Sequence, residues 1–570
     1  MRRKIIRMGR KSRECRLIAA AAVFGTAAAT IWWLGFQLGA NSGSYGSYRS
    51  LLDNTWPIVA LLGLAAVWVT GVAHVYRQAE LPPRAVAFLE THYRFGLCVL
   101  AVITALLLAA GVIALRAFPN SGDEYAYLFE AETFRAGRLW NVLPPIPDAF
   151  ASVRVLIKDG KWVSQYPPGW PIIIAGVTSL GLPAYVASPA MALLLLFGFA
   201  RLTRELVSPG AALAGTALLA CCPFFLLNGA SYFAHVPAAL FGVLTVLCGV
   251  RFLETASIPS ALAAGAALGF LCIIRPFSAV LIAIPCAVEL LRRAGSLHYT
   301  RLAWFFVGSL PFVTVYLFYN NAVTGNPLLE PMPWANPIFH LGLQPVDDFG
   351  YRYTLFHTAG LAIIRLMELA QWTSPLLCLL YAMAALWKLG SRRLAFYDFV
   401  FPLFVLGYLL FPGMGANRYG PRYYFEAYPF MVLTVISATT TWLAAWRSGS
   451  RWAAMIGVLV GAIIMGLVAY PALAYRFRGI VNARMELYDL VNKSRLSNAI
   501  VVIRSHSGDM EPLDLTRNGI DLSQSVLYAL DQPAQYCTLT RAFPGRTLYR
   551  YERKDDSGFG MLHAVQIDHC

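Results

Sequence analysis

Apolar runs long enough to cross a bilayer recur along most of the 570-residue chain. A helix of about 20 apolar residues spans the hydrocarbon core of a membrane. Hydrophobic residues make up 58% of the chain and charged residues only 13%, against about 25% charged in soluble domains. The sequence therefore predicts a mainly α-helical, polytopic membrane protein. The expected spans lie near 17–39, 56–76, 95–115, 185–206, 211–228, 233–253, 260–275, 277–293, 303–319, 360–388, 396–412, 427–446 and 452–473.

Basic residues are concentrated in the N-terminal segment "MRRKIIRMGRKSRECR" and in short loops between apolar runs. This distribution follows the positive-inside bias of membrane proteins, so the formal net charge of +16 does not predict a nucleic-acid partner. We expect a multi-pass protein of the cytoplasmic (inner) membrane, with a cytoplasmic N-terminus that contacts anionic membrane lipids. The loops expected outside are 40–55, 116–184, 320–359 and 413–426.

The chain divides into three predicted parts. Residues 1–94 hold the basic N-terminus and two apolar runs, the first of which is too long for a signal-peptide core. Residues 95–475 hold the remaining runs. In residues 476–570 the segments "NAIVVIRS", "SVLYALD" and "TLYRYER" are typical of short strands, and they predict a small α/β domain outside the membrane. Cys537 and Cys570 of that domain could pair in an oxidising compartment.

The stretch "SGDEYAYLFEAETFRAGRLW" places Asp123 and Glu124 side by side, directly after an expected span. The motif fits a capping box, with Ser121 as N-cap and Glu124 three residues later, and predicts a helix that continues through Arg135. The apolar face of this helix could lie flat on the bilayer. Capping accounts for Glu124, but Asp123 is not needed for the box.

Asp123 is the better candidate for chemistry. A carboxylate with an ordinary pKa near 4 is ionised at neutral pH, and a helix N-terminus favours the ionised form. One reaction that needs such a group is the transfer of a sugar from a lipid phosphate to a hydroxyl, in which a base takes the hydroxyl proton as the phosphate leaves. No metal-binding cluster stands out, because Asp347 and Asp348 are more typical of a solvated loop. We therefore expect metal-independent activity without a cofactor.

In such a reaction the leaving group is a lipid phosphate, which needs cations to stabilise its charge. Arginine is suited to this role, because its guanidinium group binds two phosphate oxygens at once. Arg418 and Arg422 are interleaved with tyrosines in "GANRYGPRYYFEAYP", at the mouth of an expected span. Arg275 precedes Pro276 between two short apolar runs. Because proline ends a helix and arginine is costly in lipid, we expect the chain to turn there, near the outer surface or in a polar cavity. Other basic residues of the outside loops are Arg154, Lys158, Lys161 and Arg352.

The order of these motifs resembles that of integral-membrane glycosyltransferases of the GT-C fold. The acidic pair is followed by "YPPGWP" at 166–171, "RP" at 275–276, "YNNAVTGNPLLEP" at 319–331 and "RYYFEAYPF" at 422–430. Together they are similar to the dolichyl-phosphate-mannose protein mannosyltransferase family (glycosyltransferase family 39) and to bacterial aminoarabinose transferases. The resemblance covers most of residues 95–475. It implies a core of about 11 membrane-spanning helices, preceded here by two added helices.

The resemblance also implies a reaction. A monosaccharide would move from a polyprenyl phosphate to an extracytoplasmic envelope glycan, lipid or protein, with inversion at the anomeric carbon. Asp123 would be the base, and Glu124 would orient the acceptor or assist. The residues expected to bind the donor phosphate or substrate are Arg275, Arg418, Arg422, Lys161, Tyr166, His235 and Tyr423.

The chain departs from both relatives. Aminoarabinose transferases carry a lysine where Tyr166 stands, so phosphate binding must use other cations. The mannosyltransferases carry a luminal β-trefoil insert that this chain lacks, so its C-terminal domain could take an acceptor-related role instead.

Two other classes of function stay open. A lipid-linked-sugar transporter or flippase would hold ionisable residues near mid-membrane, whereas the expected spans carry few beyond Glu368 and Arg275. A non-catalytic assembly subunit built on a transferase core is the other class. The intact pair of Asp123 and Glu124 favours an enzyme.

Overall fold

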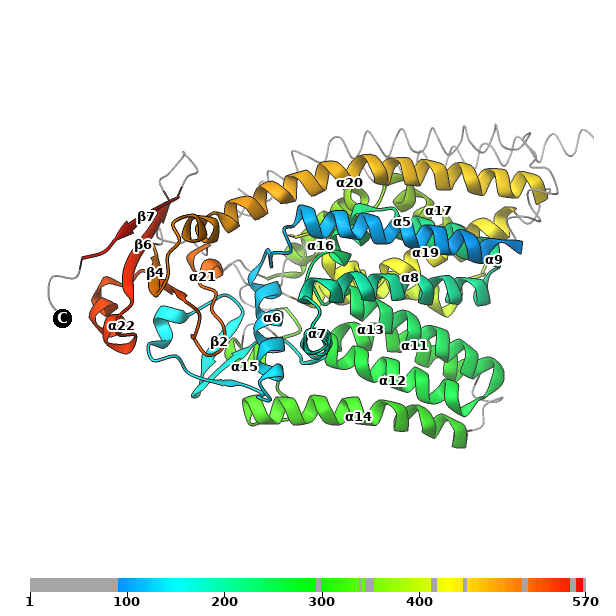
Figure 1. Ribbon diagram of the computed structural model, residues 1–570. Helices are drawn as coiled ribbons and strands as arrows, with labels where there is room; N and C mark the ends of the chain where they lie inside the picture. The colour runs from blue at the N-terminus through cyan, green and yellow to red at the C-terminus, as the bar shows by residue number, and fades with distance from the viewer. Residues whose placement is uncertain are drawn as a thin grey trace, which may run out of the picture.

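The computed structural model describes residues 91–293, 299–337, 340–343, 353–411, 418–443, 448–504, 511–553 and 560–566. The spans expected at 17–39 and 56–76 lie outside these residues, as do Asp347, Asp348, Arg352 and Cys570. A helical bundle forms most of the described structure, and two small sheets lie at one end of it (Figure 1).

The bundle is built from helices that alternate with short connections. Within the described residues, four helices are long and apolar enough to cross a membrane, or six if each of two bent pairs forms one span. One of them, α14, has only 6% of its apolar window buried, as expected for contact with lipid. The helices are α5 (Tyr93–Ala114), α8 (Ala187–Leu206), α9 (Pro209–Ala220), α10 (Pro223–Gly229), α11 (His235–Thr255), α12 (Ile258–Ile274), α13 (Pro276–Arg292), α14 (Tyr299–Thr324), α16 (Leu355–Trp372), α17 (Pro375–Gly390), α18 (Val400–Gly407), α19 (Tyr428–Leu443) and α20 (Ser448–Lys493).

Two predicted spans are each divided between two helices. The run 211–228 is divided between α9 and α10, and the run 360–388 between α16 and α17. In each case a proline occupies the first position of the second helix, Pro223 in α10 and Pro375 in α17. Proline suits that position because it has no N–H to bond to the preceding turn. Ser374 adds an N-cap, since its hydroxyl accepts the Leu376 N–H.

The predicted break at Arg275 is confirmed. Helix α12 ends at Ile274, and α13 begins at Pro276. The boundary expected near residue 475 falls inside an unbroken helix, because α20 continues for 46 residues, from Ser448 to Lys493. Figure 1 shows α20 running along the bundle and ending beside the C-terminal strands.

The loop that the sequence places outside the membrane, residues 116–184 (called the outer loop below), is folded. It contains α6 (Gly122–Arg135), β1 (Asn141–Val142), β2 (Val155–Lys158), β3 (Lys161–Ser164) and α7 (Gly169–Ser179), with antiparallel strands in the order β1-β3-β2. The helix predicted from the capping motif is confirmed, since Ser121 accepts the Glu124 N–H at 3.2 Å. The apolar face of α6 does not lie on the bilayer, because Tyr127 and Ala131 are buried in the core of the bundle.

The C-terminal strands predicted from the sequence are confirmed. They are β4, β5 and β6, and together with β7, which the sequence did not predict, they form a sheet in the order β5-β4-β6-β7. Strand β4 is parallel to β5 and β6, and β7 is antiparallel to β6. This sheet shares a hydrophobic core with the outer loop, where Phe129 and Trp162 join Ile500 and Leu527. The strands are β4 (Ala499–Ile503), β5 (Val526–Leu530), β6 (Thr547–Arg553) and β7 (Gly560–Ala564).

Short helices complete the described chain. Cys537, in α22, is disulfide-bonded, and its expected partner lies outside the described residues. The short helices are η1 (Pro147–Phe150), η2 (Ala184–Val186), α15 (Pro331–Ala335), η4 (Phe396–Phe399), η5 (Tyr408–Leu410), η6 (Arg422–Tyr424), α21 (Glu511–Leu515), η7 (Pro533–Gln535) and α22 (Tyr536–Ala542).

Candidate active site

Asp123 lies in the first turn of α6, where three groups from distant parts of the chain contact its carboxylate. Nη1 of Arg422 is 3.1 Å from Oδ2, and Nε of Arg154 is 3.6 Å from Oδ1. The hydroxyl of Tyr166 donates a hydrogen bond to Oδ1. The Asp123 side chain remains 15% exposed, so the cluster can be reached from solvent.

The charges around Asp123 favour its ionised form. Burial acts to raise the pKa of this carboxyl, but the guanidinium groups of Arg422 and Arg154 outweigh it and hold the pKa below its ordinary value. Asp123 is therefore an anion at neutral pH, as the sequence predicted.

A second ionic cluster surrounds Glu426, between η6 and α19. Its Oε1 lies 2.8 Å from Nε of Arg275 and 3.1 Å from Nδ1 of His235. Nη2 of Arg275 also donates to the hydroxyl of Tyr408 at 3.1 Å. The second oxygen of Glu426 is buried and has no hydrogen-bond partner among the described residues. Burial raises the pKa of Glu426 to about 7.

Stacked aromatic rings form one wall of this second cluster. The rings of Tyr423 and Tyr408 are 4.7 Å apart and nearly parallel, with an interplanar angle of 13°. The guanidinium groups of Arg275 and Arg365 lie 5.8 and 5.4 Å from the Tyr423 ring, within the range of cation–π attraction. Tyr423 therefore fixes cationic side chains at this site.

Tyr127 connects the two clusters. It lies one turn after Asp123 on α6, and its ring is 4.5 Å from that of Tyr166. Burial raises its pKa, and charges from both clusters act on it. Those charged residues are Arg275, Asp123, Arg422 and Glu426.

Glu124 has a different environment from Asp123. Its carboxylate is fully buried and accepts the backbone N–H of Tyr232 at 3.0 Å and the hydroxyl of Ser121 at 3.2 Å. Burial raises its pKa to about 7. Because these bonds join the start of α6 to the segment before α11, Glu124 holds Asp123 in place.

Two of the predicted phosphate-binding residues, Arg418 and Lys161, donate to backbone oxygens. Nε of Arg418 donates to the backbone oxygen of Asn120 at 3.2 Å. Nζ of Lys161 donates to the oxygens of Ala322 and Val323, at 2.8 and 2.6 Å. Lys161 thus caps the C-terminal end of α14, where a cation is favoured by the helix dipole.

The "YPPGWP" motif positions α7 beside the site. A Cβ added to Gly169 would lie 2.8 Å from the backbone carbon and oxygen of Ile273, so only glycine allows this close approach. Trp170 is fully buried, and its Nε1 donates to the backbone oxygen of Tyr232 at 2.7 Å. The motif thus fixes Tyr166 and the break at Arg275 relative to each other.

The sequence did not identify four groups of the site, namely Glu426, Tyr408, Arg365 and Tyr127. A signal existed for Arg365, because a second ionisable residue near Glu368 is unusual within an apolar run. Tyr408 gave no signal, since a tyrosine at the end of an apolar run is ordinary. Tyr127 gave none because an aromatic residue on the apolar face of a predicted helix is also ordinary. Within the residues that the structure describes, no three His, Cys, Asp or Glu side chains gather as they would around a metal ion.

Comparisons with known proteins find one family model and several solved structures. Residues 499–557 match a family described as a domain of unknown function, DUF7846. No curated protein matches the chain in sequence.

Solved structures resemble most of the chain. ArnT from Cupriavidus metallidurans in the apo state is 14% identical, with a TM-score of 0.51, over 81% of this chain and 94% of ArnT. ArnT bound to undecaprenyl phosphate is 12% identical, with a TM-score of 0.50, over 80% of this chain and 93% of ArnT. The chain has a GT-C fold. An oligosaccharyltransferase from Archaeoglobus fulgidus is also similar, with 13% identity and a TM-score of 0.45 over 79% of this chain and 64% of that one.

The chain is a multi-pass membrane protein, and the Asp123 cluster lies where α6 follows α5 at one end of the bundle (Figure 1).

Proposed function

We propose that this protein is a glycosyltransferase that moves a monosaccharide from a polyprenyl phosphate to an extracytoplasmic acceptor. The observation that carries the proposal is an ionised, partly exposed carboxylate, that of Asp123, held between Arg422 and Arg154. The GT-C fold supports it, because the same fold occurs in ArnT, which has been solved with undecaprenyl phosphate bound.

Asp123 acts as the general base. The acceptor hydroxyl attacks the anomeric carbon, a new C–O bond forms, and Asp123 takes the hydroxyl proton. The bond between the anomeric carbon and the phosphate oxygen breaks on the opposite face, and the lipid phosphate leaves with the electron pair. One displacement of this kind inverts the anomeric carbon.

Arg422 and Arg154 bind the phosphate. Guanidinium groups recognise phosphate oxygens through charge-assisted hydrogen bonds, and both side chains already face one anion, Asp123. A phosphate that enters the cluster competes with Asp123 for them. As the guanidinium groups turn to the phosphate, the pKa of Asp123 rises, so donor binding makes the carboxylate a stronger base.

The Glu426 cluster completes the donor site. Arg275 supplies a further cation, and the stacked rings of Tyr408 and Tyr423 offer an apolar wall for a sugar or isoprenoid. His235 holds Glu426 at 3.1 Å. We place this site on the extracytoplasmic side of the cytoplasmic membrane, because the basic N-terminus and loops favour that orientation. No metal takes part in the proposed reaction.

Lipid analysis of a deletion strain tests the proposal. Polyprenyl lipids are extracted and measured by mass spectrometry in the deletion strain and in strains that carry the wild type or Asp123→Asn. A polyprenyl-phosphate sugar should accumulate in the deletion strain, persist with Asp123→Asn and disappear with the wild type.

Two results would contradict the proposal. A deletion strain without a stranded donor, but with a lipid-linked sugar retained on the cytoplasmic side, would favour the transporter. Full complementation by Asp123→Asn would exclude Asp123 as the base and would fit an assembly subunit.

A further inference from the structure

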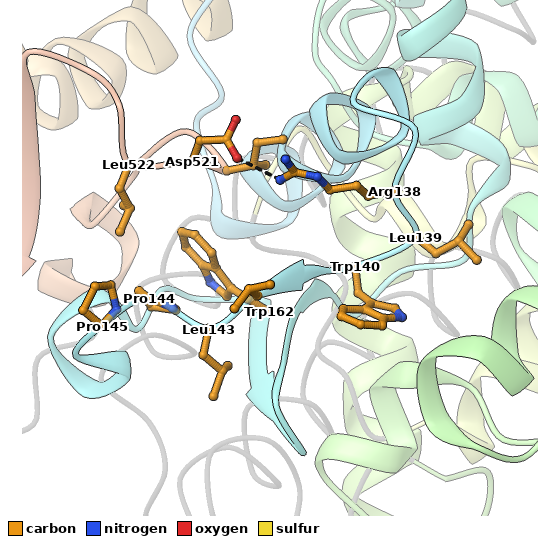
Figure 2. A pocket seen from close by; sticks show the side chains of 11 residues that line it. Arg138, Leu139, Trp140, Leu143, Pro144, Pro145, Trp162, Asp521 and Leu522 are labelled. Atoms are coloured by element: carbon orange, nitrogen blue, oxygen red, sulfur yellow. Dashed lines mark hydrogen bonds and ion pairs between the residues drawn. The ribbon is translucent and has the colours of Figure 1, made fainter.

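A pocket of about 700 Å³ opens between the outer loop and the C-terminal domain. Its volume lies within the range of small-molecule sites. One wall comes from the segment that follows α6, including Arg138 and Trp140, and the other from residues 520–522 after α21. Figure 2 shows these two walls facing each other across Trp162 of β3.

Two tryptophans supply the aromatic surface of the pocket. Trp140 is 37% exposed, and Nζ of Lys161 lies 5.6 Å from its ring centroid, which restrains the ring. Trp162 is 2% exposed and packs edge-on against Phe129 at 4.8 Å. Its indole N–H is buried and has no hydrogen-bond partner among the described residues.

An ion pair supplies the polar surface. Nη1 of Arg138 lies 2.8 Å from Oδ1 of Asp521, with the two side chains 46% and 55% exposed, and Figure 2 shows the pair at the pocket. Both side chains keep donors or acceptors that can reach a ligand. The pocket therefore combines flat aromatic and proline surfaces with a pair of opposite charges at the opening.

A sugar ring matches this combination. One face of a pyranose is formed by C–H groups and packs on an aromatic ring, while its edge carries hydroxyls that can both donate and accept hydrogen bonds. An acyl chain would take the ion pair of Arg138 and Asp521 out of water and offer it no further polar partner, which is unfavourable.

Secondary structure links the pocket to Asp123. Helix α6 runs from Asp123, in its first turn, to Arg135, three residues before Arg138. Its 14 residues give a separation of about 20 Å along the axis. A second path along the chain leads from Trp162 in the pocket to Tyr166 beside Asp123. Its four residues span about 13 Å if they are extended. The pocket is thus too far away to hold the reacting hydroxyl.

We propose that this pocket binds a pyranose of the acceptor at a distance from the reacting hydroxyl, so that the acceptor is a glycan or carries one. Only the statement that the bound saccharide belongs to the acceptor rests on the proposed function. The binding of a saccharide to the pocket does not depend on it. Binding energy from a remote part of a substrate can be used to orient the reacting group.

Saccharide binding to the full-length protein in lipid nanodiscs tests the proposal. The probes are chitotetraose, maltotetraose and mannotetraose, with lauric acid and tetra-alanine as probes for the other occupants. Saturation-transfer NMR detects contact, and titration gives Kd. At least one saccharide should bind, and Trp140→Ala should raise its Kd about tenfold.

Matched variants separate the pocket from general effects. Trp304→Ala removes a tryptophan of similar exposure, 40%, from α14, and should leave Kd unchanged. Arg138→Ala should weaken binding several-fold, whereas Arg504→Ala, which breaks a 2.9 Å pair with Glu552 of similar exposure, should not. Equal Kd values for wild type and Trp140→Ala would overturn the proposal. So would the absence of binding by all three saccharides at 10 mM (about the weakest affinity of interest), or binding of lauric acid or tetra-alanine to the pocket in their place.

The two proposals fail separately. Asp123→Asn should retain saccharide binding, because Asp123 lies outside the pocket. If a saccharide binds but no stranded donor accumulates in the deletion strain, the proposed transferase activity is contradicted and the proposed saccharide pocket still stands. If a stranded donor accumulates but no saccharide binds, the proposed saccharide pocket is contradicted and the proposed transferase activity still stands.

Discussion

Arg422 contacts Asp123 at 3.1 Å across 299 positions of the sequence. The contact forms because η6 and the first turn of α6 meet at the same end of the bundle. Each residue compensates for the burial of the other, since an unpaired buried charge is costly. The pair thus links two sequence motifs that otherwise have no visible relation.

Asp123→Asn should abolish transfer and keep the fold. Asparagine has nearly the same shape but cannot take a proton at neutral pH, and the loss of a general base costs about 10²- to 10⁴-fold in rate. The measurement is turnover of a reconstituted donor, with thermal unfolding as the control for stability. Asp148→Asn, at an exposed position of the same outer loop, should retain wild-type turnover. Wild-type turnover in Asp123→Asn would refute the assignment.

Arg422→Gln should shift the acid limb of the rate profile. In the wild type, Arg422 and Arg154 hold the pKa of Asp123 below its ordinary value of 3.8 against the effect of burial. Without Arg422, fewer cations oppose the effect of burial on Asp123, so the pKa of Asp123 rises. As the pH is lowered, kcat/KM should therefore begin to fall at a higher pH than in the wild type. The donor KM should also rise. Arg292→Gln, at an exposed residue on α13, serves as the control, and an acid limb at the same pH in Arg422→Gln and wild type would count against the ion pair.

Glu124→Gln should retain transfer and change the pH dependence of stability. Burial raises the pKa of Glu124 from 4.5 to about 7 in the folded protein. Its contribution to stability is therefore full below pH 4.5 and is lost as pH rises through 7. Glutamine does not titrate. The Tm of Glu124→Gln minus the Tm of wild type should therefore be larger at pH 8 than at pH 5. A constant difference would show that Glu124 does not titrate as described.

Glu124→Ala should destabilise the protein at both pH values. It leaves the Tyr232 N–H without its acceptor, at a cost of about 1–3 kcal/mol. Circular dichroism or fluorescence melts of the two variants separate this structural effect from the titration.

Gly169→Ala should lower stability and activity together. The new Cβ meets the backbone of Ile273 at 2.8 Å, and backbone cannot move aside as a side chain can, so α7 must shift from α12. Overpacking of this kind costs about 1–3 kcal/mol. Gly176→Ala lies in the same helix with no atom within 4 Å, and should be neutral or slightly stabilising. Equal Tm values for the two variants would contradict the close approach.

Much of the local structure was predictable from short-range signals. Ser121 and Glu124 define the start of α6 through hydrogen bonds three residues apart, and Pro276 ends α12 by removing an N–H. Three strands of the C-terminal sheet, β4, β5 and β6, follow from β-branched and aromatic runs. Each of these signals depends only on neighbours in the sequence.

The composition of the site was less predictable, because it depends on contacts between distant segments. Lys161 and Arg422 are both basic residues of outer loops, yet the first binds the end of α14 and the second binds Asp123. Only the packing of the strand β3 against α14 separates them. Glu426 likewise stands four residues after Arg422 but pairs with Arg275. Helical spacing would have given the wrong partner.

Helix α20 sets a strict requirement on chain length. Its 46 unbroken residues form a rod about 69 Å long between the bundle and the C-terminal sheet. One residue inserted near position 475 would turn everything beyond it by about 100° and advance it by about 1.5 Å. The wall that carries Asp521 would then swing away from Arg138. Between Ser448 and Ala499, natural variation in length should therefore fall in the turn after Lys493, where an extra residue leaves the phase of the rod intact.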